Sequence, residues 1–258
     1  AGNILNALGN DALFINHIFL THSHADHITD LPFIIETFFE KRETPLIIYA
    51  LEETINVLKK HSFNNIIWPD FTKIKLIKND SFSLILKPIK LNVPIQINDY
   101  SIKAIPANHI AGSCGFVITK NNQSFIISGD TYLNPTIHEE INNDKTIKSL
   151  IIECSFPDKL NELAKTTKHL TPTLISNILQ NIQRKDISVF FYHLKPSYKK
   201  ELLQDIKKNK LLNYKGKVLN EGDVIHINTG NIENNLLTED KLEEIMKINL
   251  ALTSQHNK

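Results

Sequence analysis

The chain has 258 residues, of which 41% are hydrophobic and 22% charged, and its formal net charge is +1. This length and composition are typical of a globular protein with a substantial core, and we expect residues 1–258 to form a single domain. The charge balance argues against a nucleic-acid-binding protein, which usually carries a basic excess. No apolar run approaches the ~20 residues that span a bilayer, which argues against a membrane-spanning protein.

The first half of the chain alternates helical and strand-like patterns. Turn residues interrupt short apolar patches over 1–11. Apolar residues at three- and four-residue spacing predict a helix over 28–42, and an amphipathic helix is predicted over 51–63. Strands are predicted at 46–50, 73–78, 82–90, 101–107 and 114–119, with a polar connection over 91–100. The two cysteines, Cys114 and Cys154, have apolar neighbours and are predicted to be buried.

The second half continues in the same mixed order. Strands are predicted at 124–131, 148–156, 187–195, 216–219 and 223–228. Helices are predicted at 135–143, 158–166, 171–184, 197–210 and about 239–250. The helix at 171 begins with a Thr cap followed by Pro. This order of elements fits two sheets packed face to face with helices outside.

A dense polar cluster follows the apolar run Ile18-Phe19-Leu20. It consists of His22, His24, Asp26 and His27. A strand that ends near Thr21 would direct His22 and His24 to one side, because alternate residues of a strand share a face. A solvated histidine-rich turn is the alternative, but clustered His and Asp side chains at the end of a buried strand indicate a metal site.

Three later apolar strands also end in a side chain that can bind metal: His109, Asp130 and His193. Each alone could be a hydrogen-bonded structural residue. Together with the first cluster they make five histidines and two aspartates, enough for two divalent ions with three or four protein ligands each. Imidazole ligands favour zinc, although the carboxylates would also admit manganese or iron.

Two further residues are candidates for proton transfer. Glu153 lies in the otherwise apolar stretch LIIECSF, where a buried carboxylate needs a partner. His169 precedes a predicted helix, and a hydrogen bond from His169 to Glu153 would favour the protonated imidazolium. Such a group could protonate a leaving alkoxide. The alternative is that His169 only helps to cap the helix.

The pattern HSHADH with later His109, Asp130 and His193 resembles the metallo-β-lactamase superfamily. Further stretches resemble its class II cyclic nucleotide phosphodiesterases. These stretches are THSHADHITDLP (21–32), NNIIWPD (64–70), SGDT (128–131), IIECSFPDK (151–159), KHLTPTLISNIL (168–179) and FYHLKPSYKKELLQDI (191–206).

The resemblance implies an α/β protein, an αββα four-layer sandwich with a binuclear zinc site. His22, His24 and His109 would bind one ion, Asp26, His27 and His193 the other, and Asp130 would bridge them. The implied activity is hydrolysis of cyclic AMP or cyclic GMP to the 5′-monophosphate by a bridging hydroxide, which Asp26 would orient. By similarity to the tRNA 3′-processing nucleases of the superfamily, Glu153 and His169 match a proton-donating pair.

Alternative functions are a tRNA 3′-processing nuclease of the same superfamily and a non-catalytic metal-binding module. For the main hypothesis we expect a small cyclic nucleotide as substrate and no nucleic acid or membrane partner. Whether the protein forms a homodimer is left open. Phe71, Trp68 and Tyr132 are candidates for stacking on the base, although packing is the simpler role for Trp68. Only 21 residues precede His22, so we expect short or missing first strands; a cytoplasmic location is expected, with the periplasm as alternative.

Overall fold

The computed structural model describes residues 3–220, 222–226 and 231–234. A three-stranded parallel sheet has the order β1-β2-β3, with β1 (His17–Phe19), β2 (Leu46–Leu51) and β3 (Leu84–Ile89). A seven-stranded sheet has the order β10-β9-β8-β7-β6-β5-β4. Its strands are β4 (Pro94–Ile97), β5 (Tyr100–Pro106), β6 (Cys114–Lys120), β7 (Gln123–Ile127), β8 (Ile147–Glu153), β9 (Ser188–Tyr192) and β10 (Lys217–Val218). A separate antiparallel pair comprises β11 (Asp223–His226) and β12 (Asn231–Asn234).

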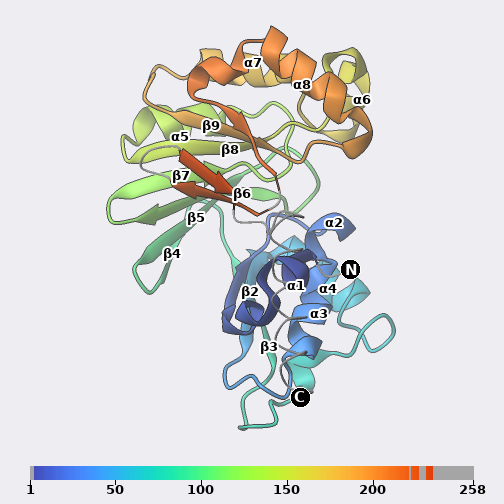
Figure 1. The fold of residues 1–258 in the computed structure, drawn as a ribbon. Coiled ribbons are helices and arrows are strands. Elements are labelled where there is room, and N and C mark those ends of the chain that lie inside the picture. Colours follow the sequence, from blue (N-terminus) through green and yellow to red (C-terminus); the bar gives the residue numbers. More distant parts are fainter. Residues whose placement is uncertain (1–2, 221, 227–230, 235–258) are drawn as a thin grey trace, which may run out of the picture.

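The helices fall into two groups, one beside the three-stranded sheet and one beside the seven-stranded sheet (Figure 1). These are called the small and the large sheet below. The first group is α1 (Asn3–Leu8), α2 (Ala25–Ile28), α3 (Asp30–Thr37) and α4 (Glu52–His61). The second group is α5 (Thr136–Asn143), α6 (Asn161–Thr167), α7 (Pro172–Gln180) and α8 (Lys199–Lys208). Short 3-10 helices are η1 (Gly9–Phe14), η2 (Phe71–Lys73), η3 (Asp158–Leu160), η4 (Pro196–Tyr198) and η5 (Leu211–Tyr214).

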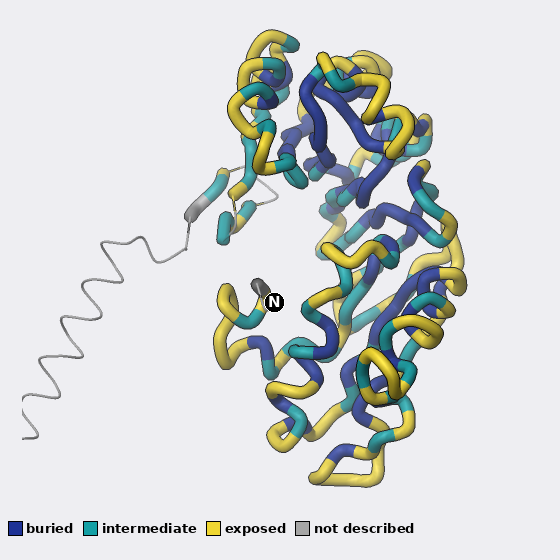
Figure 2. Tube along the Cα trace, turned by 90° about the vertical axis from the view of Figure 1, so that its right-hand side faces the viewer, coloured by how far each residue is buried: buried dark blue, intermediate teal, exposed yellow. Residues whose placement is uncertain are grey.

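The alternation of side chains along β2 divides the core into layers. Ile48 packs in a cluster with residues of α3 and α4, whereas its neighbour Tyr49 packs with Phe116 of β6. Alternate residues of a strand face opposite sides, so β2 joins a helix layer to the seven-stranded sheet. A third cluster joins that sheet to α5, α7 and α8. The result is the predicted αββα sandwich, and Figure 2 shows buried segments inside the molecule and exposed segments along its outside.

Some sequence-based predictions of secondary structure are wrong. The predicted strand over 73–78 is a loop with one isolated bridge, Lys75 to Phe82. Its alternating lysines imitate a strand, but the Leu76 N–H bonds to the Ser81 carbonyl in a turn. The connection predicted over 91–100 contains β4, an edge strand where Pro94 is tolerated.

Other predictions differ at their boundaries. The residues before β1, predicted as turns, form α1 and η1. The helix predicted over 28–42 is split into α2 and α3 and ends at Thr37. The predicted helix over 239–250 lies outside the described residues. Within the described ranges no helix has both the length and the apolar character needed to cross a bilayer.

The strand directions bring the candidate site to one edge of the large sheet. β7, β8 and β9 are parallel neighbours, so their carboxyl ends lie together. β5 and β7 each pair antiparallel with β6, so β5 runs in the same direction as β7. The segments that follow β5, β7, β8 and β9 therefore meet at the same edge, and these segments carry His109, Asp130, Ser155 and His193.

Candidate metal centre

The histidine-rich segment after β1 is attached to the edge of the large sheet. The backbone N–H of Cys114 donates to the Thr21 carbonyl at 2.9 Å. Gly129 contacts the same two residues, Thr21 and Cys114, and has a φ of +62°. A Cβ on Gly129 would lie 2.5 Å from the Cys114 carbonyl oxygen. Only glycine fits this close approach at a positive φ. The junction places the segment from the small sheet beside the strand ends of the large one.

The first four candidate ligands come from this segment and from α2. β1 ends at Phe19, earlier than predicted, but the rings of His22 and His24 still meet, with centroids 4.8 Å apart. Asp26 and His27 lie on α2, directly after His24. His22 is fully buried, whereas His24 and Asp26 are exposed. The segment thus lines the site from its buried floor to the solvent.

The other three candidate ligands come from the large sheet. His109 follows β5, Asp130 follows β7, and His193 follows β9. His109 and Asp130 are buried. His193 has a φ of +60°, an uncommon conformation for a residue other than glycine. Such backbone conformations persist where the surroundings hold the residue in place, and they are common at functional sites.

The seven side chains form two groups, and Asp130 lies close to histidines of both. Metal-binding atoms of His22, His24, His109 and Asp130 all lie within 4.8 Å of one another, and so do those of Asp26, His27 and His193. Asp130 Oδ2 lies 3.7 Å from His22 Nε2, 3.3 Å from His27 Nε2 and 3.4 Å from His193 Nε2. The two groups match the two ligand sets that the family resemblance implies; that they bind metal stays a prediction.

The unsatisfied atoms of the site fit cations. Among the described residues, the buried atoms His22 Nε2 and Asp130 Oδ1 have no hydrogen-bond partner. His109 Nδ1 donates to the Lys168 carbonyl at 3.0 Å, so in a neutral imidazole its Nε2 lone pair faces His24 Nδ1 at 3.0 Å. Buried polar atoms are normally paired. Imidazole nitrogens and carboxylates that converge without partners are the donor set for zinc.

The electrostatics of His22, His109 and Asp130 favour the forms of these three side chains that bind metal. Burial, together with the charge of the neighbouring His27, lowers the pKa of His22 to about 3. Burial also lowers the pKa of His109. Burial alone would raise the pKa of Asp130, but the hydrogen bond from His27 and the charges of the surrounding histidines hold it below its ordinary value. A neutral imidazole and an ionised carboxylate are the species that coordinate metal.

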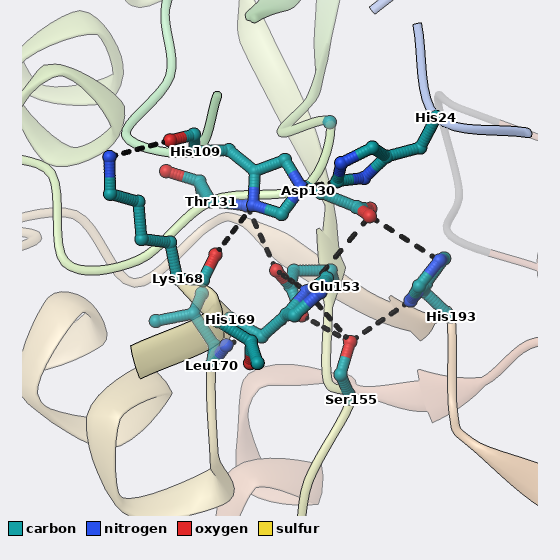
Figure 3. Close-up of polar contacts among 12 residues, drawn as sticks. His24, His109, Asp130, Thr131, Glu153, Ser155, Lys168, His169, Leu170 and His193 are labelled. Carbon is teal, nitrogen blue, oxygen red and sulfur yellow. Dashed lines mark hydrogen bonds and ion pairs between the residues drawn. The ribbon is translucent and has the colours of Figure 1, made fainter. Parts of the chain in front are cut away.

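Glu153 is the centre of a hydrogen-bonding network beneath this cluster (Figure 3). Its Oε1 accepts from the Thr131 N–H at 2.8 Å and from His169 Nδ1 at 2.9 Å. Its Oε2 accepts from the Ser155 hydroxyl at 2.5 Å and from the Leu170 N–H at 3.3 Å. Glu153 and His169 are both buried. The predicted contact between them is therefore present, and His169 Nδ1 lies 3.9 Å from Asp130 Oδ2.

The alternative role of His169, a helix cap, is filled by another residue. The Thr171 hydroxyl accepts from the Leu174 N–H at the start of α7. The three candidates for stacking on the base lie in different parts of the fold. Trp68 and Phe71 pack in the core of the small sheet and its helices, whereas Tyr132 packs beside the core of the large sheet. A cavity of about 590 Å³ opens beside His193 and is lined by Pro196, Lys199 and Asn220 among others.

Sequence reasoning missed two residues of the network. Ser155 contacts Glu153 and His193, and Lys168 donates from Nζ to the His109 carbonyl at 2.7 Å. Each lies within two residues of a predicted site residue, in the stretches IIECSFPDK and KHLTPT. Their closeness in sequence to Glu153 and His169 could have indicated that they lie near the site. A serine or a lysine, however, forms no sequence pattern that predicts which side chain it contacts.

The fold and the cluster define the class of protein. The chain superposes on the solved structure of unliganded yeast PDE1 with a TM-score of 0.66 and 21% identity, over 80% of this chain and 66% of that one. It superposes on the metallo-β-lactamase fold protein YhfI from Bacillus subtilis with a TM-score of 0.60 and 16% identity, over 83% and 78%. The protein therefore has the metallo-β-lactamase fold, with a His/Asp cluster suited to divalent metals.

The sequence comparisons then identify the family. The chain belongs to the family described as "Anti-Pycsar protein Apyc1", which matches residues 1–213. It is also 28% identical over 225 residues to a "Probable 3′,5′-cyclic-nucleotide phosphodiesterase" from Yersinia pestis, over 75% of this chain. The predicted resemblance to cyclic nucleotide phosphodiesterases is thus confirmed. The chain spans 60% of that relative's length.

Proposed function

We propose that this protein is a binuclear zinc phosphodiesterase that hydrolyses 3′,5′-cyclic nucleotides to 5′-monophosphates, with cyclic AMP and cyclic GMP as the first candidates. One observation carries the proposal: the buried Glu153–His169 pair lies beside the cluster, 3.9 Å from Asp130. A metal-storage site needs no such proton-transfer group. Similarity to a protein named as a probable cyclic nucleotide phosphodiesterase supports the choice of substrate.

The proposed ligand sets are those predicted from the sequence, and their burial and spacing fit two ions. His22, His24 and His109 would hold the first ion, Asp26, His27 and His193 the second, and Asp130 would contact both. When bound, the ions supply Lewis acidity, which polarises phosphoryl oxygens and acidifies water. Zinc fits the histidine-rich set, and manganese or iron would be accepted by the same ligands.

The side chains of the protein would move the protons of the reaction. A water oxygen forms the new bond to phosphorus as the bond from phosphorus to the 3′ oxygen breaks, and the water releases one proton to solvent, from which His169 is later reprotonated. Asp26, exposed at the mouth of the site, accepts a hydrogen bond from the attacking water and orients it. Glu153 Oε1 accepts a hydrogen bond from His169 Nδ1, which orients the ring, and His169 Nε2 gives its proton to the departing 3′ oxygen.

The test is a substrate panel on zinc-loaded protein. The panel contains cyclic AMP, cyclic GMP, a chromogenic phosphodiester and a precursor tRNA, and chromatography identifies the products. We expect 5′-monophosphates from the cyclic nucleotides. Asp130→Ala should lower kcat/KM by more than about a hundredfold, because loss of a ligand should exceed the loss of a group that only orients one.

The same panel separates the alternatives. Intact cyclic nucleotides with a cleaved tRNA precursor would favour the RNA-processing nuclease. Two bound ions with no turnover of any substrate would favour a non-catalytic module. Metal analysis that finds no zinc in the reconstituted protein would contradict the binuclear centre itself.

A further inference from the structure

Ser155 occupies an unusual position between the proton-transfer pair and the second group of candidate ligands. It lies two residues beyond the end of β8 and is fully buried. Its hydroxyl oxygen lies 2.5 Å from Glu153 Oε2, 2.9 Å from His193 Nδ1 and 3.3 Å from His169 Nδ1. Figure 3 shows these side chains converging on it from three segments of the chain.

The single proton of the hydroxyl decides the direction of these bonds. Both oxygens of Glu153 face backbone N–H groups, of Thr131 and Leu170, as well as the neighbouring side chains, and a carboxylate can only accept. Ser155 therefore donates to Glu153 Oε2, and its lone pairs accept from His193. His169 Nδ1 lies closer to Glu153 Oε1, at 2.9 Å, and donates there. It follows that His193 carries a proton on Nδ1.

This assignment determines which atom of His193 faces the cluster. In a neutral imidazole with the proton on Nδ1, the Nε2 lone pair points toward Asp26 Oδ2 at 3.3 Å and Asp130 Oδ2 at 3.4 Å. A lone pair opposed to two carboxylate oxygens is unfavourable unless a cation lies among them. Histidine ligands usually donate their other ring N–H to a carboxylate or carbonyl, which orients the ring. Here a serine hydroxyl stands between the histidine and the carboxylate.

We infer that Ser155 is a positioning residue for the second metal ion: its hydroxyl orients His193 and links it to Glu153. One carboxylate thereby orients two histidines, His169 directly and His193 through the hydroxyl. The first group does not use this link, because His109 is oriented by the Lys168 carbonyl. The inference rests on the proposed binuclear centre and predicts that loss of the hydroxyl weakens one ion selectively.

The test is a zinc titration of chelator-stripped protein against a chromogenic competitor. Ser155→Ala should weaken the second zinc by about 10- to 100-fold and leave the first within about threefold. Ser155→Thr restores a hydroxyl and should recover much of the affinity. Ser83→Ala is the matched control: Ser83 is equally buried, and its hydroxyl lies 3.0 Å from the carbonyls of Phe71 and Ile74, just before β3 and away from the cluster. It should keep both zinc affinities.

The outcomes separate this inference from the proposed function. If wild-type protein binds two zinc ions and folded Ser155→Ala binds both equally well, the role of Ser155 is refuted and the binuclear centre stands. If wild-type protein binds fewer than two zinc ions, the binuclear centre is refuted.

A measurement on the wild-type protein covers the case in which Ser155→Ala does not fold. Proton–nitrogen NMR of zinc-loaded protein with ¹⁵N-labelled histidine reports which ring nitrogen carries hydrogen, and loss of a signal in His193→Gln assigns it. We expect His193 to be protonated at Nδ1. A proton at Nε2 with bare Nδ1 would overturn the inference.

Discussion

The acid–base state of each side chain in the cluster follows from its immediate surroundings. His22 is fully enclosed, and burial lowers its pKa. For His27, burial would lower the pKa, but the hydrogen bond and charge of Asp130 raise it. Asp130 in turn has a lowered pKa because histidines surround it. These opposed shifts let neutral and charged groups coexist within a few ångströms.

The roles of His169 and Glu153 predict a dependence on the leaving group. His169→Ala should lower kcat/KM for cyclic AMP by about 10²- to 10⁴-fold, because an alkoxide leaving group needs a proton. A nitrophenyl phosphodiester releases a weakly basic phenolate that needs no proton. For this substrate the variant should lose less than about tenfold in kcat/KM. Glu153→Gln should show the same selectivity. Steady-state kinetics on zinc-loaded protein checks this, and equal losses on both substrates would refute proton donation by His169.

The lowered pKa of His22 predicts acid sensitivity of the metal-free protein. Its pKa is about 3 when folded and 6.5 ordinarily, so between these values the unfolded chain binds more protons and stability falls as pH falls. From pH 7 to pH 5 the protonation of this histidine in the unfolded chain should lower the free energy of unfolding by about 2 kcal/mol. Urea unfolding of chelator-stripped protein at both pH values measures the change.

His22→Gln supplies the comparison for this pH effect. The variant should lose less stability than wild type between pH 7 and pH 5. His61→Gln, at an exposed position on α4, serves as the control and should behave as wild type. An unchanged pH dependence in His22→Gln would contradict the assignment.

At the scale of elements, the site depends on how strands end. β7, β8 and β9 stop within a few residues of Asp130, Glu153 and His193. The turn after β7 contains Gly129, which packs against Thr21 and the Cys114 carbonyl. The backbone at this turn, rather than a side chain, therefore determines how closely the two halves of the site approach.

Gly129→Ala should disturb this junction. The added Cβ would clash with the Cys114 carbonyl, and the residue would also be strained at a φ of +62°. We expect the free energy of unfolding to fall by about 1–3 kcal/mol. Gly9→Ala is the matched control, since Gly9 also has a positive φ, +52°, but no atom lies within 4 Å of its added Cβ. It should lose only the cost of the backbone conformation, about 1 kcal/mol. Urea unfolding compares them, and equal losses would show that the close approach is unimportant.

At the scale of the whole molecule, the site lies across the contact between two sheets. Phe19 stacks on Tyr49 with ring centroids 4.4 Å apart, and its edge-to-face contact with Phe116 joins the small sheet to the large one. His22 and His24 follow the small sheet, whereas His109 and His193 follow the large one. Each proposed ion would therefore bind both sheets at once.

Zinc should consequently stabilise the whole fold. Binding that occurs only in the folded state adds about 2.7 kcal/mol per ion at a free concentration of 100 times Kd. Calorimetry or urea unfolding with zinc and with excess chelator measures the difference. Asp130→Ala should lose most of it, and Asp99→Ala, at an exposed acid bonded to Lys120, should keep it. Equal stability of wild type with zinc and with chelator would contradict the link.

The sequence by itself determined the composition of the site. Polar side chains placed directly after apolar strands are costly unless paired, and this pattern identifies His22, His24, Asp26, His27, His109, Asp130 and His193. The αββα order of elements was also predictable from periodicity. The 73–78 segment was not, because its alternation of Lys with Ile and Leu is compatible with a loop whose backbone bonds close a turn.

Only the tertiary structure decided how these residues cooperate. Whether His22 and His193 meet at Asp130 depends on strand directions and on the junction at Gly129, which are long-range contacts with no local pattern. The position of Ser155 between Glu153 and His193 has the same origin. Hydrophobic burial along a strand is encoded in neighbouring residues, whereas the partner of one hydroxyl is decided only when distant segments pack together.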